Sequence, residues 1–209
     1  MKYRYWIFDL DNTLHFADIK IFPLVNKKMD AYIQNKLNIS KKKSALLRQY
    51  YWDVYGATLP GLIKHHQINP QDFLKITHDL MFNNDTILFP KNIKHTLKNI
   101  PVRKLVFTNA PKAYSEKILK HMKIYRLFNG VHSIEDSNFL GKPNQHSFHQ
   151  LFKDNKFKHG VMIDDVKENL IIAKKMGLIT IWFSKERYKP NYVDYKIFNL
   201  QQLKRLRIS

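Results

Sequence analysis

Two carboxylates follow a short apolar segment near the start of the chain, and this feature constrains the fold more than any other. Residues 3–8 are rich in aromatic and β-branched side chains, which is typical of a buried strand, and Asp9 and Asp11 come directly after them. In an open α/β sheet, ligands bind just beyond the carboxyl ends of the strands. Two acids crowded there repel one another unless a cation or a shared proton relieves them, so the pattern predicts a Mg²⁺ site. A strand followed by an Asx-type turn is the alternative that this segment leaves open.

Amphipathic helical patterns replace the strand pattern from about residue 19 to about residue 89. Three apolar stripes recur at helical spacing: Leu24, Met29, Tyr32, Ile33 and Leu37; Leu46, Leu47, Tyr50, Tyr51 and Val54; and Phe73, Ile76, Thr77, Leu80 and Met81. Ser40 and Asn69 are expected to cap helices, and turns are expected at Gly56, Pro60-Gly61 and Asn69-Pro70. Because this region begins directly after the acidic strand end, we expect it to cover the site as a lid.

From residue 91 onward, strands and helices alternate. The patterns predict strands at 102–107, 131–134, 160–163, 179–183 and 193–197, and helices at 91–99, after Pro111, at 147–152, at 169–176 and at 200–206. Such alternation implies a parallel sheet with both faces covered. The fold class predicted from the patterns is therefore α/β, with an inserted helical region.

The composition favours an intracellular protein that binds anions. The chain has 209 residues, no cysteine and no apolar stretch long enough to span a bilayer, so we expect a cytoplasmic protein without a membrane partner. Its formal net charge of +19 attracts anions in general. The lysines are scattered and no nucleic-acid-binding fingerprint is present, so we expect a small phosphorylated metabolite, rather than nucleic acid, as the main partner.

Polar side chains at several strand ends and loops together describe a phosphoryl-transfer site. They are Asp9 with Asp11, Thr108, Lys142, and Asp164 with Asp165. A carboxylate can attack phosphorus and form an aspartyl-phosphate, which water then hydrolyses. That reaction requires a metal to offset phosphoryl charge, an acid to protonate the leaving oxygen, and fixed donors for the remaining oxygens.

The same residues resemble the haloacid dehalogenase-like (HAD) hydrolases over nearly the whole chain. The matching motifs are residues 9–13 (Asp-Leu-Asp-Asn-Thr), Thr108-Asn109, Lys142-Pro143, and Asp164-Asp165 with Asn169 four positions after Asp165. The resemblance implies a Rossmann-like parallel sheet core, formed by residues 1–15 and 91–209, with an inserted all-helical cap at 16–90. It also implies that Asp9 is the nucleophile and Asp11 the general acid/base, and an acid at position 11 indicates a phosphatase.

The resemblance assigns further roles to the polar residues. Mg²⁺ would be held by Asp9, the Asp11 carbonyl, and the pair Asp164 and Asp165, of which Asp165 would be the direct ligand. Lys142 would neutralise the nucleophile and the phosphoryl charge. Phosphate or substrate would be bound by Thr108, the Asn109 backbone and Asn12.

The helical region is similar to the cap of the pyrimidine 5′-nucleotidase-like branch of this superfamily. The similarity rests on Tyr50-Tyr51, residues 55–62 (Tyr-Gly-Ala-Thr-Leu-Pro-Gly-Leu) and Asp72-Phe73. That branch hydrolyses nucleoside monophosphates such as UMP and CMP, and its relatives accept other phosphate monoesters, for which sugar phosphates and lysophospholipid phosphates are candidates. Most members have Tyr where this chain has His15, which bears on the cap hinge and on substrate choice. Tyr51 and Tyr55 are candidate base contacts, although aromatic stripes of this spacing are also typical of a core.

Two alternatives remain at this point. The pairs His65-His66 and His146/His149 have spacings that could hold a metal, but two imidazoles do not complete a zinc site, so surface or core roles are preferred. A basic, nucleic-acid-associated protein that keeps the fold without the chemistry is the alternative to an enzyme.

Overall fold

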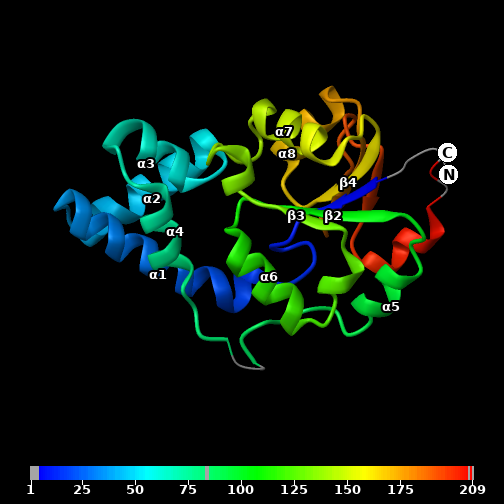
Figure 1. Ribbon diagram of the computed structural model, residues 1–209, viewed down its shortest axis with the longest axis horizontal. Helices are drawn as coiled ribbons and strands as arrows, with labels where there is room; N and C mark the ends of the chain where they lie inside the picture. The colour runs from blue at the N-terminus through cyan, green and yellow to red at the C-terminus, as the bar shows by residue number, and fades with distance from the viewer. Residues whose placement is uncertain (1–4, 83–84, 207, 209) are drawn as a thin grey trace.

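The computed structural model of the chain describes residues 5–82, 85–206 and 208. Six parallel strands form one sheet in the order β3-β2-β1-β4-β5-β6 (Figure 1). The strands are β1 (Tyr5–Phe8), β2 (Arg103–Phe107), β3 (Gly130–His132), β4 (Gly160–Asp164), β5 (Ile179–Phe183) and β6 (Tyr195–Ile197). The predicted α/β class and Rossmann-like core are confirmed. Tyr3 and Arg4, predicted to begin the first strand, lie outside the described residues.

Helices cover both faces of this sheet. Successive side chains of a strand point to opposite faces, so the apolar side chains of each buried strand need a covering layer on either side. On one face, Phe8 and Val106 pack in a core with helices α5 (Ile93–Lys98), α6 (Lys112–His121) and the 3-10 helix η3 (Leu200–Arg205). On the other face, Ile7 and Phe107 pack with α7 (Gln145–Asn155) and α8 (Lys167–Lys175). Short 3-10 turns η1 (Tyr125–Leu127) and η2 (Glu135–Ser137) flank β3. The predicted elements of this region are therefore present with shifted ends, and the last helix is 3-10 instead of α.

Four helices between β1 and β2 form a separate lobe with a core of its own, to the left in Figure 1. They are α1 (Ala17–Leu37), α2 (Lys41–Tyr55), α3 (Thr58–His66) and α4 (Pro70–His78). The chain leaves and re-enters the sheet region side by side, since the Phe16 N–H donates to the Leu88 carbonyl at 2.7 Å. These linkers lie close to the predicted boundaries at 16 and 90, and the division into two domains stays a prediction. No helix in the described ranges has the length and apolar character needed to cross a membrane.

The predicted turn at Pro60-Gly61 is wrong, because both residues lie inside α3. Proline is tolerated in the first turn of a helix, where its missing N–H removes no hydrogen bond. Gly61 is explained by packing: a Cβ atom there would lie 2.3 Å from the Tyr51 ring. The other signals are confirmed, since Gly56 ends α2 with φ +77°, and the Ser40 and Asn69 side chains cap α2 and α4.

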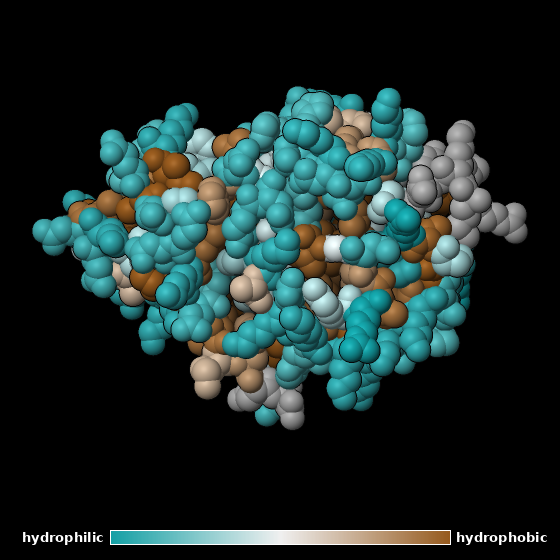
Figure 2. All heavy atoms as spheres, in the orientation of Figure 1, coloured by the Kyte–Doolittle hydropathy of each residue, from teal (hydrophilic) through white to brown (hydrophobic). Residues whose placement is uncertain are grey.

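The second predicted stripe faces the core of the lobe only in part, through Leu47 and Tyr51. Leu46, Tyr50 and Val54 are exposed, whereas Ser44 and Tyr51 are the buried residues of α2. The buried face is thus rotated by about one residue position, because the small Ser44 and the glycine beneath Tyr51 let the neighbouring helices approach. Figure 2 shows apolar patches, in brown, on the surface of the lobe.

The contact between Tyr51 and Gly61 provides a test of the lobe. Alanine in place of a helical glycine normally stabilises a protein, by up to about 1 kcal/mol. Here we expect Gly61→Ala to lower the free energy of unfolding by about 1–3 kcal/mol, because the added methyl group overpacks against the ring. Urea denaturation measures the difference. Gly130→Ala is the matched control, since its Cβ would meet only Leu105, at an ordinary 3.4 Å. Equal effects of the two substitutions would contradict the packing argument.

Candidate active site

The sheet topology brings together acids that are about 155 positions apart in the sequence. β1 lies between β2 and β4, so the strand order reverses beside it, and ligands bind at such switch points in α/β sheets. Phe8 is in register with Ile163, and the Asp9 N–H donates to the Ile163 carbonyl at 2.9 Å. Asp9, at the end of β1, therefore lies beside Asp164, at the end of β4. The two predicted carboxylate groups share one edge of the sheet.

Lys142 joins the two strand ends from the loop that precedes α7. Its side chain is 1% exposed, and its Nζ donates to Asp9 Oδ1 and to Asp164 Oδ2, at 2.7 Å each. Burial alone would lower the pKa of Lys142, but the charges of Asp164 and Asp9 raise it above its ordinary value. The lysine is thus a fixed cation, and it reaches the site from a segment more than 130 residues away from Asp9 in the sequence.

Three carboxylates form a group that fits a divalent cation. Asp9, Asp164 and Asp165 each offer an oxygen, and these atoms lie within 4.8 Å of one another. Asp9 Oδ2 is buried and accepts no hydrogen bond from any described residue. Burial, as the largest cause, and the neighbouring carboxylates raise the pKa of Asp9 to about 7 and that of Asp165 to about 9, although the charge of Lys142 lowers both. One ammonium group does not balance three crowded acids, so hard oxygen ligands and residual negative charge suit Mg²⁺.

Asp164 and Asp165 differ in how many hydrogen bonds their carboxylate oxygens already accept. Asp164 Oδ1 accepts hydrogen bonds from the Val166 N–H at 2.9 Å and the Asn169 amide at 3.0 Å, and Lys142 occupies Oδ2. For the Asp165 carboxylate, the contact seen among the described residues is the Thr13 hydroxyl, at 3.4 Å from Oδ1. This supports Asp165 as the more available ligand, and Asn169 has the role of orienting Asp164.

Asp11 lies outside the three-acid group and has different partners. His15 Nε2 and the Tyr114 hydroxyl both lie against Asp11 Oδ1, at 2.9 and 2.8 Å. Tyr114 comes from α6, and its ring packs edge-on against His78 of α4, with centroids 5.5 Å apart. Burial lowers the pKa of His78 to about 4, so this ring is neutral near pH 7. The carboxylate is therefore held on one side by the core and the lobe together.

The predicted phosphate-binding residues also shape the loops. Thr108 is buried, and its hydroxyl accepts a hydrogen bond from the Ala110 N–H at 3.0 Å. The Asn109 side chain accepts from the Lys142 N–H at 2.6 Å and donates to the carbonyls of Lys142 at 2.8 Å and Gly56 at 3.2 Å. It thereby ties the lysine loop to the end of α2. Asn12, at φ +64°, accepts from the Asp18 N–H and fixes the start of α1.

The two cap tyrosines have partners within the lobe. The Tyr51 hydroxyl pairs with His66 Nε2 and the Tyr55 hydroxyl with His65 Nε2, each at 2.8 Å. Tyr51 is buried, while Tyr55 is half-buried and directly precedes Gly56, which touches the lysine loop. Their contact with substrate stays a prediction. Neither histidine pair considered from the sequence belongs to a three-ligand group in the described part of the chain.

Sequence reasoning missed three contributors to the site. Tyr114 and Thr13 had no role assigned from the sequence, and the Asn109 side chain was not considered. The sequence holds no direct signal for Tyr114, because its partner Asp11 is 103 residues away. For Thr13, the signal was its place in the motif that contains both acids.

The buried lysine gives a stability test that needs no substrate. Removing one partner of a buried ion pair typically costs about 3–5 kcal/mol, because a charge remains uncompensated. We expect Lys142→Met to lower the free energy of unfolding by about that amount in metal-free buffer, as measured by urea denaturation. Lys174→Met is the control: Lys174 pairs with Asp194 while half-exposed, so its loss is expected to cost less than about 1 kcal/mol. A small effect at Lys142 would contradict its assigned role.

Comparisons with known proteins agree with this geometry. The family described as "Haloacid dehalogenase-like hydrolase" matches residues 6–183. Phosphate metabolism protein 8 of Saccharomyces cerevisiae is 25% identical over 196 residues, which cover 84% of this chain and 60% of that protein. The chain thus spans about three fifths of the length of this curated relative.

Three solved structures share the fold at low sequence identity. A HAD phosphatase from Thermococcus onnurineus is 18% identical, with a TM-score of 0.66 and coverage of 97% of this chain and 96% of that one. L-2-haloacid dehalogenase from Xanthobacter autotrophicus is 12% identical, with a TM-score of 0.65 and 97% of both chains covered. YfnB of Bacillus subtilis, solved bound to magnesium, is 18% identical, with a TM-score of 0.63 and 98% of both covered. Taken with the family match over most of its length, the chain belongs to the haloacid dehalogenase-like hydrolases.

Proposed function

We propose that the protein is a Mg²⁺-dependent phosphatase that hydrolyses a phosphate monoester through an aspartyl-phosphate on Asp9. The observation that carries this proposal is the placement of Lys142 between Asp9 and Asp164, with Asp9 Oδ2 buried and without a hydrogen-bond partner among the described residues. A carboxylate oxygen held in this way is oriented to attack phosphorus. Asp11, two residues further on, supplies the acid that an alkoxide leaving group requires.

The residues of the chain account for both halves of the proposed reaction. In the first half, an Asp9 oxygen bonds to phosphorus, the bond from phosphorus to the substrate oxygen breaks, and the Asp11 carboxyl gives its proton to that oxygen. In the second half, Asp11 takes a proton from water, which attacks phosphorus and releases inorganic phosphate from Asp9. Lys142 faces Asp9 throughout and offsets negative charge. Thr108 and the Asn109 backbone are proposed to bind the remaining phosphoryl oxygens.

The residues present fit a bound Mg²⁺. Asp9 and Asp165 would hold it most directly, with Asp164 beside them and the Asp11 carbonyl as a further proposed ligand. When bound, Mg²⁺ neutralises charge on the phosphoryl group and favours in-line attack. The magnesium in the YfnB structure supports this choice of metal.

A dehalogenase is the second candidate, because haloacid dehalogenases share the fold. In that reaction the carboxylate attacks carbon and a halide leaves, so neither a metal nor a second acid is needed. The crowding of Asp9, Asp164 and Asp165 and the presence of Asp11 favour phosphate instead. Halide release from 2-chloropropionate in the presence of a chelator would support the dehalogenase.

The proposed substrate is a nucleoside 5′-monophosphate, handled in the cytoplasm as a small soluble metabolite. The resemblance of the cap to the pyrimidine 5′-nucleotidase-like branch supports this choice, and the name of the yeast relative refers to phosphate metabolism. The hydrogen bond between Asn109 and the Gly56 carbonyl places the end of α2, with Tyr55, against the loop that carries Lys142. Sugar phosphates and lysophospholipid phosphates are the alternative monoesters.

A panel of substrates tests the proposed specificity. We expect pyrimidine nucleoside monophosphates to give the highest kcat/KM with Mg²⁺ present, and chelation to abolish turnover of every substrate. Release of inorganic phosphate is the measurement. A preference for sugar phosphates would replace the substrate class but leave the phosphatase proposal in place. Turnover that survives chelation would overturn the metal requirement.

The nucleophile is tested with an aryl phosphate. Asp9→Asn is expected to reduce kcat by at least about 10⁴-fold, because an amide oxygen does not form the covalent intermediate. Circular dichroism should show an unchanged fold. Asp18→Asn serves as the matched control, since Asp18 is an exposed acid at the start of α1. The Asp18→Asn variant is expected to hydrolyse the aryl phosphate at the wild-type rate. Retained turnover in a pure Asp9→Asn preparation would dispose of the mechanism.

The partners of Asp11 give a test of the acid. Removing the Tyr114 hydroxyl frees one side of Asp11 Oδ1, so we expect Tyr114→Phe to lower kcat by about 10-fold, as for other hydrogen bonds to charged groups. The loss should be larger for an alkyl phosphate than for an aryl phosphate, because a poor leaving group depends more on the acid. Tyr32→Phe, which removes a comparable hydroxyl from Asp72 in the lobe, should leave both rates unchanged. Equal losses for both substrates would indicate a purely structural role.

A further inference from the structure

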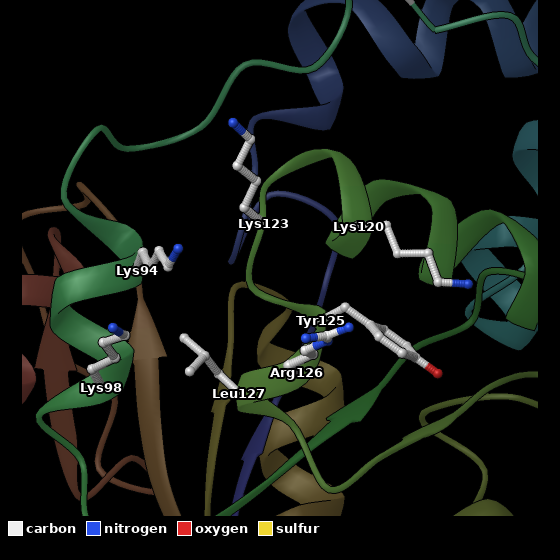
Figure 3. A pocket seen from close by; sticks show the side chains of 7 residues that line it. All are labelled: Lys94, Lys98, Lys120, Lys123, Tyr125, Arg126 and Leu127. Atoms are coloured by element: carbon white, nitrogen blue, oxygen red, sulfur yellow. The ribbon is translucent and has the colours of Figure 1, made fainter.

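A basic hollow lies on the other side of the core from the acids. Its volume is about 640 Å³, and Figure 3 shows its lining: Lys94, Lys98, Lys120, Lys123, Tyr125, Arg126 and Leu127. The lysines come from α5, from α6 and from the second residue after the end of α6, whereas the last three residues form η1. Five of the seven lining residues are cationic, and none is acidic.

Most of these cationic side chains have no ion-pair partner among the residues that the structure describes. Lys120 is paired with Glu116, at 3.0 Å. The other four cations, which are Lys94, Lys98, Lys123 and Arg126, are exposed, and no side-chain hydrogen bond or ion pair joins them to any described residue. Like charges gathered around one hollow repel each other, and an anion bound there relieves that repulsion.

The basic surface continues across α5. A second hollow, of about 360 Å³, is lined by Asn92, His95, Thr96, Gln201, Lys204 and Arg205. Helix α5 supplies lining residues to both hollows, and η3 packs beside it and contributes Lys204 and Arg205. Two hollows with cationic side chains at their rims, separated by one short helix, form a track that is longer than one phosphate group requires.

This track is separate from the candidate active site. Thr108 and the beginning of α6 lie at the carboxyl ends of the strands, near Asp9, and α6 then runs back along the sheet. Its far end is followed by η1 and then by the start of β3, where the Asn129 N–H donates to the Lys104 carbonyl of β2. The hollow thus lies towards the amino ends of the strands, so a ligand there leaves the carboxylates accessible.

We propose that this track, defined by Lys94, Lys98, Lys123, Arg126 and the Lys204-Arg205 pair, binds the phosphodiester backbone of single-stranded nucleic acid. A strand carries regularly spaced negative charges that can reach both hollows, which a single small anion does not. Tyr125 and Arg126 offer ring and guanidinium planes on which exposed bases can stack. The binding is independent of base sequence and supplements the hydrolase activity of the family.

Fluorescence anisotropy with a labelled single-stranded RNA of about 16 nucleotides tests the proposal. The RNA carries a 5′-hydroxyl group, so it presents no terminal phosphate to the active site. The test variant is Lys94→Gln/Lys98→Gln/Arg126→Gln. The matched control is Lys41→Gln/Lys42→Gln/Lys43→Gln, which removes the same charge from exposed positions on α2.

We expect the test variant to bind at least about 10-fold more weakly than the wild type, and the control variant to change affinity less than about 2-fold. If about four phosphates are contacted, the log-log salt dependence of the wild type between about 50 and 200 mM should have a slope near −3, falling to about −1 in the test variant. Hydrolysis of an aryl phosphate should be unchanged in both.

Other outcomes would overturn the proposal. Equal losses in the two variants would show that only the net charge matters, and a flat titration at low salt would show that the track binds no strand. Full competition by ATP, at the affinity of the RNA, would assign the hollow to a small polyphosphate. Binding to anionic phospholipid vesicles with the same loss in the test variant, and none to RNA, would assign it to a membrane surface. Single-stranded DNA is expected to compete with the RNA, because both carry the same backbone charge.

Discussion

The buried contact of one ammonium group with two carboxylates organises this protein. Lys142 lies 2.7 Å from both Asp9 and Asp164, and neither strand end could bring its acid so close to the other without a cation between them. The contact fixes the loop after η2 against the central strands β1 and β4. It also leaves one Asp9 oxygen, close to Asp165, without a hydrogen-bond partner in the described part of the chain. The same arrangement therefore stabilises the carboxyl ends of these strands. It also leaves the three acids with too little positive charge nearby, and a divalent cation supplies that charge.

The helical lobe is coupled to that contact through a few polar groups. The Asn109 side chain bonds to the backbone of Lys142 and to the Gly56 carbonyl, and a Cβ atom at Gly56 would lie 2.4 Å from the Lys142 carbonyl oxygen. On the opposite side, His78 of α4 packs on Tyr114, which in turn bonds to Asp11. Movement of the lobe would therefore change the surroundings of both the nucleophile and the proposed acid.

Much of the fold followed from local patterns, and the exceptions have physical causes. Apolar runs predicted the buried strands, and Ser40 and Asn69 predicted helix starts, since capping depends on nearby backbone groups. Helix α3 was missed because Pro60 and Gly61 were interpreted as a turn, whereas the Tyr51 ring decides that position 61 has no side chain. Leu46, Tyr50 and Val54 of the stripe on α2 face outward for a similar reason. Helix orientation depends on which neighbours can approach closely, and this is a property of packing.

The sequence by itself determined the alternation of strands and helices in the sheet region, the family motifs and the set of acids and lysine that the site contains. These depend on residue type and spacing, which are local. Only the tertiary structure decided that Lys142 contacts both acids, that Tyr114 and His15 share one oxygen of Asp11, and that the cations of α5, α6 and η1 surround one hollow. Each of these contacts except that of His15 joins segments distant in the sequence, and their meeting is set by strand order and helix packing, which no short stretch of residues encodes.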